Sequence, residues 1–135
     1  MIFLIDLNDA IKIAKVAMSK AYTPYSKYHV GAALVCKSGT IYSGCNIENH
    51  GIQSICAERV AFSKAISEGH KDFDYIVICG AKENIKNIIN GTPCGYCRQF
   101  MSEFVNKDFK VYTVGPNDQI TAYTMQDLLP HNYSI

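Results

Sequence analysis

Hydrophobic and polar residues alternate with helix periodicity in the first segment of the chain. Between residues 7 and 21, apolar side chains recur every three or four positions and lysines occupy other directions. This pattern predicts an amphipathic helix. Asp6 or Asn8 is suited to cap its N-terminus. Pro24, which lacks a backbone N–H, closes the region.

Strand patterns follow, and then a second helix pattern. The apolar, β-rich runs 28–36 and 40–47 are separated by the Lys37-Ser38-Gly39 turn, which predicts a β-hairpin. Helix spacing returns from residue 56 to about residue 68, and Gly69 is a natural stop for that helix.

The second half of the chain continues the alternation. Residues 75–79, YIVIC, are continuously apolar, as in a strand that is covered on both faces. Pro93 suits the first turn of a helix, and an apolar stripe at helix spacing runs from Cys97 to Val105. The remaining patterns predict strands at 111–114 and 120–123 and a short helix at 125–129.

This order of elements predicts an α/β fold with three αβα layers, in which helices cover both faces of a central mixed sheet of about five strands. The 135 residues suffice for one core but not for two, so we expect a single domain over residues 1–135. Strand-to-strand crossovers place consecutive helix starts near one sheet edge. We therefore expect Cys56 to meet Cys94 and Cys97 there.

The charge balance argues against a polyanionic partner. The chain has 13 basic and 12 acidic residues and a net charge of +1, so it lacks the field that gathers nucleic acid or an anionic membrane. Its nine tyrosines and six phenylalanines could stack on single-stranded bases, but their spacing favours core and interface positions. A small-molecule ligand fits better, and polynucleotide editing is the weaker alternative.

We expect a cytoplasmic protein without a membrane anchor. No apolar run approaches the roughly 20 residues of a membrane-spanning helix, and the apolar start of the chain lacks the basic residues of a secretory signal. In a reducing compartment, paired cysteines indicate metal binding or catalysis more often than disulfides. Cys36, Cys45 and Cys79 lie in apolar surroundings and are expected to be buried small side chains.

Cys94 and Cys97 form a C-x-x-C pair that suits a redox disulfide, half of a structural zinc site, or a catalytic metal. A redox pair is expected earlier in the chain, and a zinc ribbon needs a second C-x-x-C, so both lose support without being excluded. Cys56 is the third candidate ligand. Three thiolates with a fourth position open to water match a catalytic zinc, which lowers the pKa of its water to about 7, with Glu58 as the adjacent base.

Three thiolates carry more negative charge than zinc balances, which predicts a cation beside them. Arg59 and Arg98 each directly follow one of the motifs and could donate hydrogen bonds to the sulfurs. The competing hypothesis is a non-catalytic zinc module in which a fourth protein ligand closes the site. That hypothesis leaves Glu58 without a role.

CAER at residues 56–59 and PCGYC at residues 93–97 resemble H-x-E with P-C-x-x-C, the signature of the zinc-dependent deaminases. With cysteine in the histidine position, the chain resembles the small cytidine deaminases and, more distantly, the blasticidin-type deaminases. Similar segments extend over nearly the whole chain: AYTPYSKYHVGAAL (21–34), GCNIEN (44–49), CAERVAFSKAISEG (56–69) and LLP (128–130).

The resemblance implies one Zn²⁺ per chain on Cys56, Cys94 and Cys97, with Glu58 as the proton shuttle and Arg59 neutralising the thiolates. The implied reaction is hydrolytic deamination of cytidine or deoxycytidine to uridine or deoxyuridine plus ammonia, as in pyrimidine salvage. No organic cofactor is needed. The resemblance also implies a homotetramer.

Substrate contacts follow from the same resemblance. Asn46 and Glu48 match the pair that holds the ribose hydroxyls, and an amide and a carboxylate supply the donors and acceptors that a diol needs. The Ala57 backbone N–H and the Thr92 carbonyl match groups that hold the pyrimidine O2 and the departing amino group.

The chain differs from the family pattern at two aromatic positions and in one loop. Tyr28 and Tyr133 stand where relatives carry phenylalanine; both keep an aromatic face for the substrate and add a hydroxyl. The segment 49–55 is one residue shorter and lacks a tyrosine that relatives place at a neighbouring subunit's site. A deaminase of a cytosine-containing antibiotic or modified nucleoside, as in the blasticidin type, is therefore the alternative function.

Overall fold

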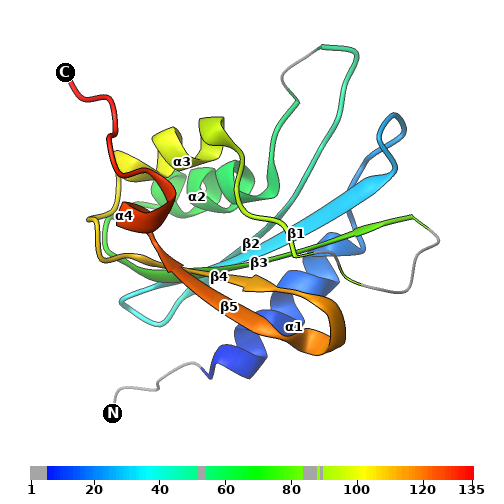
Figure 1. Cartoon of the computed structure of the whole chain (residues 1–135), viewed down its shortest axis with the longest axis horizontal. Coiled ribbons are helices and arrows are strands. Elements are labelled where there is room, and N and C mark those ends of the chain that lie inside the picture. The colour runs from blue at the N-terminus through cyan, green and yellow to red at the C-terminus, as the bar shows by residue number, and fades with distance from the viewer. Residues whose placement is uncertain (1–5, 52–53, 84–87, 89) are drawn as a thin grey trace.

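The chain folds into three layers in a computed structural model that describes residues 6–51, 54–83, 88 and 90–135 (Figure 1). A five-stranded sheet with the order β2-β1-β3-β4-β5 is the middle layer. α1 covers one face, and α2 and α3 cover the other. The predicted α/β fold with αβα layers is confirmed. The elements are α1 (Leu7–Met18), β1 (Tyr28–Cys36), β2 (Ile41–Cys45), α2 (Ala57–Ser67), β3 (Phe73–Lys82), α3 (Gly95–Ser102), β4 (Lys110–Val114), the 3-10 turn η1 (Pro116–Asp118), β5 (Ile120–Thr124) and α4 (Met125–Leu128).

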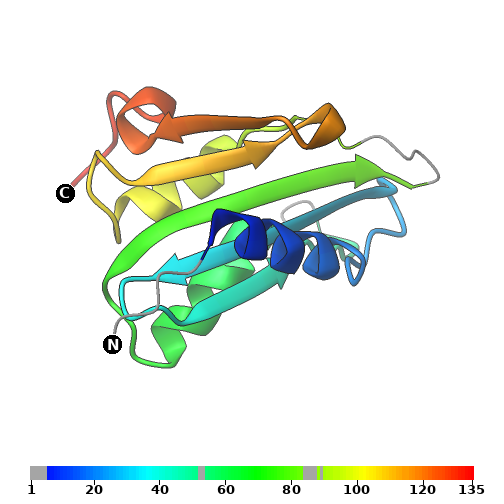
Figure 2. The ribbon, with the colours of Figure 1, turned by 90° about the horizontal axis from the view of Figure 1, so that it is seen from below.

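Parallel and antiparallel pairs are mixed in this sheet. β1 pairs antiparallel with β2 and β3, β3 pairs parallel with β4, and β4 pairs antiparallel with β5. β2 and β3 therefore run in the same direction, as do β3 and β4. α2 and α3 each follow the carboxyl end of one of these strands, so both helices begin at the same sheet edge. Figure 2, seen from below, shows α1 on the opposite face.

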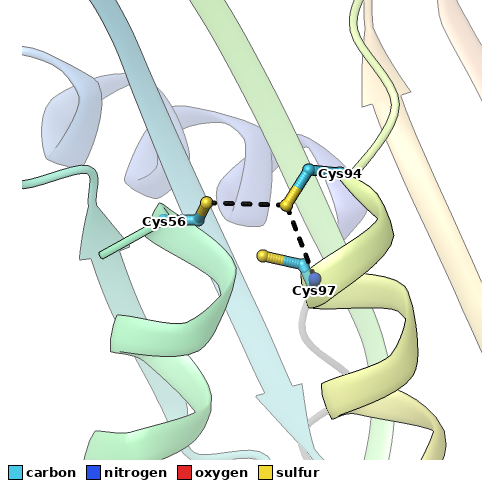
Figure 3. Close-up of side chains that lie close together, drawn as sticks. All are labelled: Cys56, Cys94 and Cys97. Atoms are coloured by element: carbon cyan, nitrogen blue, oxygen red, sulfur yellow. Dashed lines mark hydrogen bonds between the residues drawn. The ribbon is translucent and has the colours of Figure 1, made fainter. Parts of the chain in front are cut away.

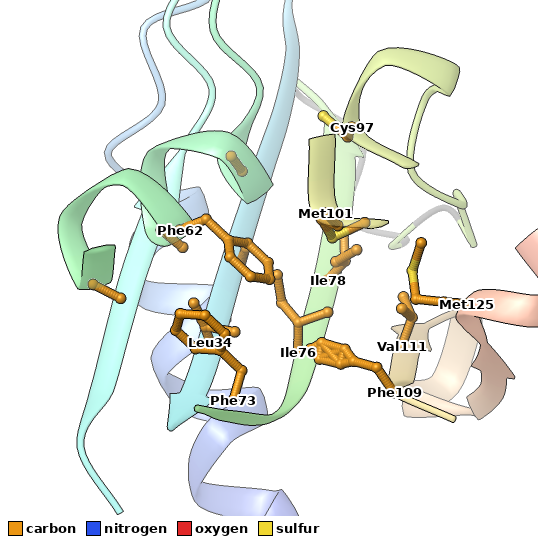
Figure 4. Close-up of a cluster of buried hydrophobic side chains, with 14 of the residues drawn as sticks. Leu34, Phe62, Phe73, Ile76, Ile78, Cys97, Met101, Phe109, Val111 and Met125 are labelled. Carbon is orange, nitrogen blue, oxygen red and sulfur yellow. The ribbon is translucent and has the colours of Figure 1, made fainter. Parts of the chain in front are cut away.

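The core beneath α2 and α3 is centred on Phe62 (Figure 4). Its fully buried ring lies edge-on to Phe73 and Phe109, at centroid distances of 5.0 and 6.2 Å. Met101 of α3 and Ile76 of β3 are also fully buried in this cluster. Close packing of these side chains fixes the two helices relative to each other and to the sheet.

A second core cluster joins α1 to the other face of the sheet. Its fully buried members include Ala10 and Ala14 of α1 and Val77 of β3. Asp6 caps the helix, because its carboxylate accepts a hydrogen bond from the Asn8 N–H at 3.1 Å. Of the helices within the described ranges, none is both long and apolar enough to cross a bilayer.

Some element boundaries differ from the predicted ones. β3 spans Phe73–Lys82 instead of 75–79, because it pairs with β1 along most of its length as well as with β4. α3 ends at Ser102, so Phe104 and Val105 of the predicted stripe follow the helix and still pack on the core.

The three cysteines outside the motifs differ in burial. Cys36 and Cys79 are buried, which confirms the prediction. Cys45 is only half-buried, and for it the prediction is wrong. β2 is an edge strand, so one side of it has no neighbouring strand to cover its end.

Candidate metal centre and active site

Three cysteine sulfurs converge where α2 and α3 begin (Figure 3). Cys56 is the N-cap of α2, Cys94 is the N-cap of α3, and Cys97 lies one turn later on α3. The three Sγ atoms lie within 4.8 Å of one another, and those of Cys56 and Cys94 are 3.7 Å apart. A tetrahedral zinc with Zn–S bonds of about 2.3 Å sets its sulfurs about 3.8 Å apart. The cluster therefore fits a zinc ion.

The close approach of α2 to the sheet depends on a glycine in β2. A Cβ built on Gly44 would lie 2.4 Å from the carbonyl oxygen of Ala57 and 2.7 Å from the N of Ala61. No side chain fits between the two backbones at this point. Gly44 therefore sets the depth at which the first turn of α2, with Cys56 before it, sits on the sheet.

The sulfur atoms share protons and charge. Hydrogen bonding from Cys97, and then from Arg59 and Cys94, lowers the pKa of Cys56 to about 5 against the opposing effect of burial. The pKa of Cys97 is raised, because its proton is held in the bond to Cys56 and its sulfur is buried. Cys56 is therefore readily a thiolate, the form that binds metals.

The two arginines after the motifs have different contacts. Arg59 donates from Nη2 to the Cys56 Sγ at 3.5 Å, as expected for a cation that offsets thiolate charge. For Arg98 the same prediction is wrong. Its guanidinium donates instead to the carbonyls of Pro93 and Leu128 and to the Thr92 hydroxyl, at 2.7, 2.8 and 2.9 Å. The side chain of Arg98 thus fastens the segment before α3 to the end of α4.

A pocket of about 210 Å³ opens beside the sulfurs. Its lining includes four of the predicted substrate-binding residues together with Cys56, Cys94 and Glu58, and these four are Tyr28, Asn46, Ala57 and Thr92. Glu58 is 4% exposed. Burial, and then the negative charge at Cys56, raises the pKa of Glu58 to about 7. The pocket thus combines a candidate metal centre with a carboxyl group that can gain or lose a proton near neutral pH.

Asn46 and Glu48 are both held by the backbone around β1. The Asn46 side chain donates to the Tyr28 carbonyl at 2.8 Å and accepts from the Val30 N–H at 2.9 Å. Glu48 lies outside the pocket lining, where one carboxylate oxygen accepts from the N–H groups of Tyr25 and Ser26 at 3.0 and 3.1 Å. The second oxygen of Glu48 is free of those two bonds.

The two tyrosines that replace phenylalanines of the family pattern lie in different places. Tyr28 lines the pocket, and its hydroxyl reaches toward the backbone of Gly80 and Gly91. Burial, then the charges of Glu58 and Cys79, raises the pKa of that hydroxyl. Tyr133 is 73% exposed and lies outside the pocket lining of its own chain.

Other residues around the site were not predicted from the sequence. The Gln99 side chain brackets the backbone of Tyr133, donating to its carbonyl at 2.9 Å and accepting from its N–H at 3.2 Å.

The shortened loop 49–55 includes residues 52 and 53, which lie outside the described residues.

Sequence reasoning also missed an aromatic contact beside the sulfurs and part of the pocket wall. The Tyr96 ring covers the Arg59 guanidinium, with 4.1 Å from the Arg59 Cζ to the ring centroid. Val30, Ile78 and Gly80 line the pocket from β1 and β3. Alternation along the strands could have put these three on one face, but no local signal pairs Tyr96 with a residue of another helix.

Comparisons with known proteins agree with this geometry. The family model described as "Cytidine and deoxycytidylate deaminase zinc-binding region" matches residues 5–113. Cytidine deaminase from Sporosarcina psychrophila is 42% identical over 130 residues, covering 96% of this chain and 92% of that protein. Blasticidin-S deaminase from Bacillus cereus is 34% identical over 130 residues, covering 92% and 91%. The crystal structure of cytidine deaminase from Burkholderia pseudomallei superposes with a TM-score of 0.84 at 34% identity, covering 96% and 100%.

Proposed function

The chain belongs to the cytidine and deoxycytidylate deaminase family, and from that membership we propose zinc-dependent hydrolytic deamination of cytidine or deoxycytidine to uridine or deoxyuridine and ammonia. One observation carries the proposal. Three sulfurs within 4.8 Å of one another lie beside a buried carboxyl group in the same pocket. A purely structural zinc module has no need of that carboxyl group.

Cys56, Cys94 and Cys97 would hold zinc, which would supply the Lewis acidity that activates water for hydrolysis. Glu58 does the proton transfer. With a pKa of about 7, its carboxyl group can accept a proton from the attacking water and deliver it to N3 of the ring. It can then take the second proton from the hydroxyl newly formed on C4 and deliver it to the departing amine. Burial of Glu58 supports this role, because a general acid–base works best with a pKa near the ambient pH.

The substrate contacts are part of the proposal. Asn46 lies at the pocket wall, and Glu48 has one carboxylate oxygen outside its backbone bonds. Both are assigned to the ribose hydroxyls. The Ala57 N–H belongs to the first turn of α2, where backbone donors have no acceptor within the helix; it is assigned to the pyrimidine O2. The Thr92 carbonyl is assigned to the amino group, and Tyr28 to the face of the base.

Tyr133 takes part in this proposal through a second copy of the chain. Its side chain is exposed and lies outside the pocket of its own chain, so a contact with the base needs a neighbouring subunit. We infer a homotetramer in which the tail 125–135 contacts a neighbour. Light scattering after gel filtration would give the mass in solution. We also assign the reaction to pyrimidine salvage in the cytoplasm, where cysteine ligands stay reduced.

The alternative substrate is a cytosine-containing antibiotic or modified nucleoside. The 34% identity to Blasticidin-S deaminase from Bacillus cereus supports this alternative. The 42% identity to cytidine deaminase from Sporosarcina psychrophila favours the simple nucleosides. Comparing turnover of cytidine, deoxycytidine and blasticidin S separates the two substrate classes.

Replacing Glu58 with Gln tests the proposed chemistry. The amide keeps the shape of the side chain but cannot shuttle a proton, so we expect one zinc per chain, an unchanged fold and ammonia release lowered at least about 100-fold. Turnover is measured as ammonia release with cytidine, zinc content by mass spectrometry and the fold by circular dichroism. Equal turnover before and after the substitution would remove Glu58 from the mechanism, and a protein without zinc would overturn the proposal itself.

A further inference from the structure

Tyr96 is the residue between the two cysteines of PCGYC, and it lies on the first turn of α3. Tyr96 is 55% exposed, so it contributes little to the core. Its contact is with the neighbouring helix. The Arg59 Cζ, on the first turn of α2, lies 4.1 Å from the ring centroid, well within the roughly 6 Å that marks a cation–π contact.

The hydrogen bonds of Arg59 leave the orientation of its guanidinium poorly defined. Its Nη2 donates to the Ser54 carbonyl at 3.4 Å and to the Cys56 Sγ at 3.5 Å. Its buried Nε has no hydrogen-bond partner in the part of the chain that the structure describes. Both of these bonds come from one nitrogen, and the bond to the carbonyl oxygen is longer than the usual N–H···O range, so they alone leave the guanidinium plane free to turn. The aromatic ring is therefore the contact best placed to fix the plane of the guanidinium.

The two contacts use different parts of the guanidinium and reinforce each other. The edge of the Arg59 guanidinium donates to Cys56, and its face lies on Tyr96. Because Cys56 and Cys94 come from separate helix starts (Figure 3), the stacked pair also links α2 to α3 beside the metal centre. Arg59 supplies one positive charge beside three cysteine sulfurs, in the half-buried position where screening is reduced.

We propose that Tyr96 is a positioning residue for the metal centre: its ring holds the Arg59 guanidinium against the Cys56 thiolate and so slows loss of zinc from the three cysteines. The inference rests on the proposed zinc site and adds a residue to it. Tyr96 acts on the metal through Arg59, without contact to the substrate. Its loss should therefore lower kcat and leave KM unchanged.

Two substitutions separate the ring from its hydroxyl. Tyr96→Leu keeps an apolar side chain without a π face, and we expect zinc transfer from the holoenzyme to a colorimetric chelator to be about 3- to 30-fold faster. Tyr96→Phe keeps the ring and should release zinc at the rate of the unsubstituted protein. The proposal would be overturned if the Phe variant released zinc as fast as the Leu variant, or if the Leu variant released zinc as slowly as the original protein.

A double substitution tests whether Tyr96 acts through Arg59. In an Arg59→Met background, Tyr96→Leu should add less than about twofold to the rate of zinc release, because the contact is already gone. A full additional effect in that background would contradict the proposal. Zinc release is measured without substrate, so these results stand apart from the proposed reaction. An original protein that holds no zinc would instead count against the proposed function.

Discussion

Glu48 has its carboxylate held by backbone amides of the segment before β1. The two N–H donors, from Tyr25 and Ser26, precede β1, and both bind the same carboxylate oxygen. Hydrogen bonds to the charged form favour ionisation. A hydrogen bond from the Ser26 side chain is the largest cause that lowers the pKa of Glu48. Burial opposes it with a smaller effect, and the Ser26 and Tyr25 amides and the charge of Lys27 lower the pKa further. The carboxylate is therefore ionised and oriented before a ligand binds.

We expect Glu48 to titrate below the ordinary range of a glutamate. Because its folded-state pKa is lowered, its contribution to the free energy of unfolding is present above the ordinary pKa and is lost as pH falls through the folded value. Ser26→Ala removes the largest cause, so the pKa should move up toward the ordinary value. Carbon-13 NMR titration of the glutamate carboxyl groups measures this. Ser38→Ala, in the distant hairpin turn, is the control, and an unmoved Glu48 in the Ser26 variant would refute the assignment.

What the sequence can predict about single residues depends on how local their signal is. Pro93 and the apolar stripe from Cys97 predict that a helix begins here, and on such a helix the C-x-x-C spacing sets Cys94 and Cys97 about one turn apart. Arg98 follows Cys97 directly, but the helix turns by about 100° per residue, and its guanidinium reaches Leu128 instead of the sulfurs. The contact of Tyr96 with Arg59 joins two helices and has no counterpart in local spacing.

At the scale of elements, packing between backbones decides where the candidate catalytic groups lie. α2 carries Glu58 and follows Cys56, and its distance from β2 is set at Gly44. The helix and strand types were predictable from periodicity, because burial on one face imposes it. The extended length of β3 was not, because it comes from pairing with β1, which continues through the polar end of the strand at Lys82.

We expect Gly44→Ala to lower the free energy of unfolding by about 1–3 kcal/mol, the usual cost of overpacking. The added Cβ would lie 2.4 Å from the Ala57 carbonyl oxygen, so α2 must move away from the sheet and carry Cys56 with it. Urea denaturation measures the stability, and metal analysis should show reduced zinc content. Gly95→Ala is the matched control, because a Cβ there meets nothing within 4 Å. If both variants were equally stable, the close approach at Gly44 would not govern the position of α2.

The candidate metal ligands come from two helices, α2 and α3, that are distant in sequence. Cys56 belongs to the segment between β2 and β3, and Cys94 and Cys97 belong to the segment between β3 and β4. Both crossovers cover the same sheet face and share the core around Phe62. A metal bound by all three cysteines therefore adds a link between elements that packing already brings together. It should stabilise the folded chain through binding that the unfolded chain cannot reproduce.

We expect removal of zinc by a chelator to lower the melting temperature of the whole chain. Free zinc at 100 times its Kd adds about 2.7 kcal/mol to the stability of the folded state, which corresponds to roughly 8 °C for a domain of this size. Cys94→Ser should abolish the difference between chelated and zinc-loaded samples, because it removes one ligand of the cluster. Cys45→Ser should keep the full difference, since Cys45 lies outside the cluster. Calorimetry of the three proteins, each with and without chelator, measures the shifts. An original protein that melts at the same temperature before and after chelation would show that the metal does not couple α2 to α3.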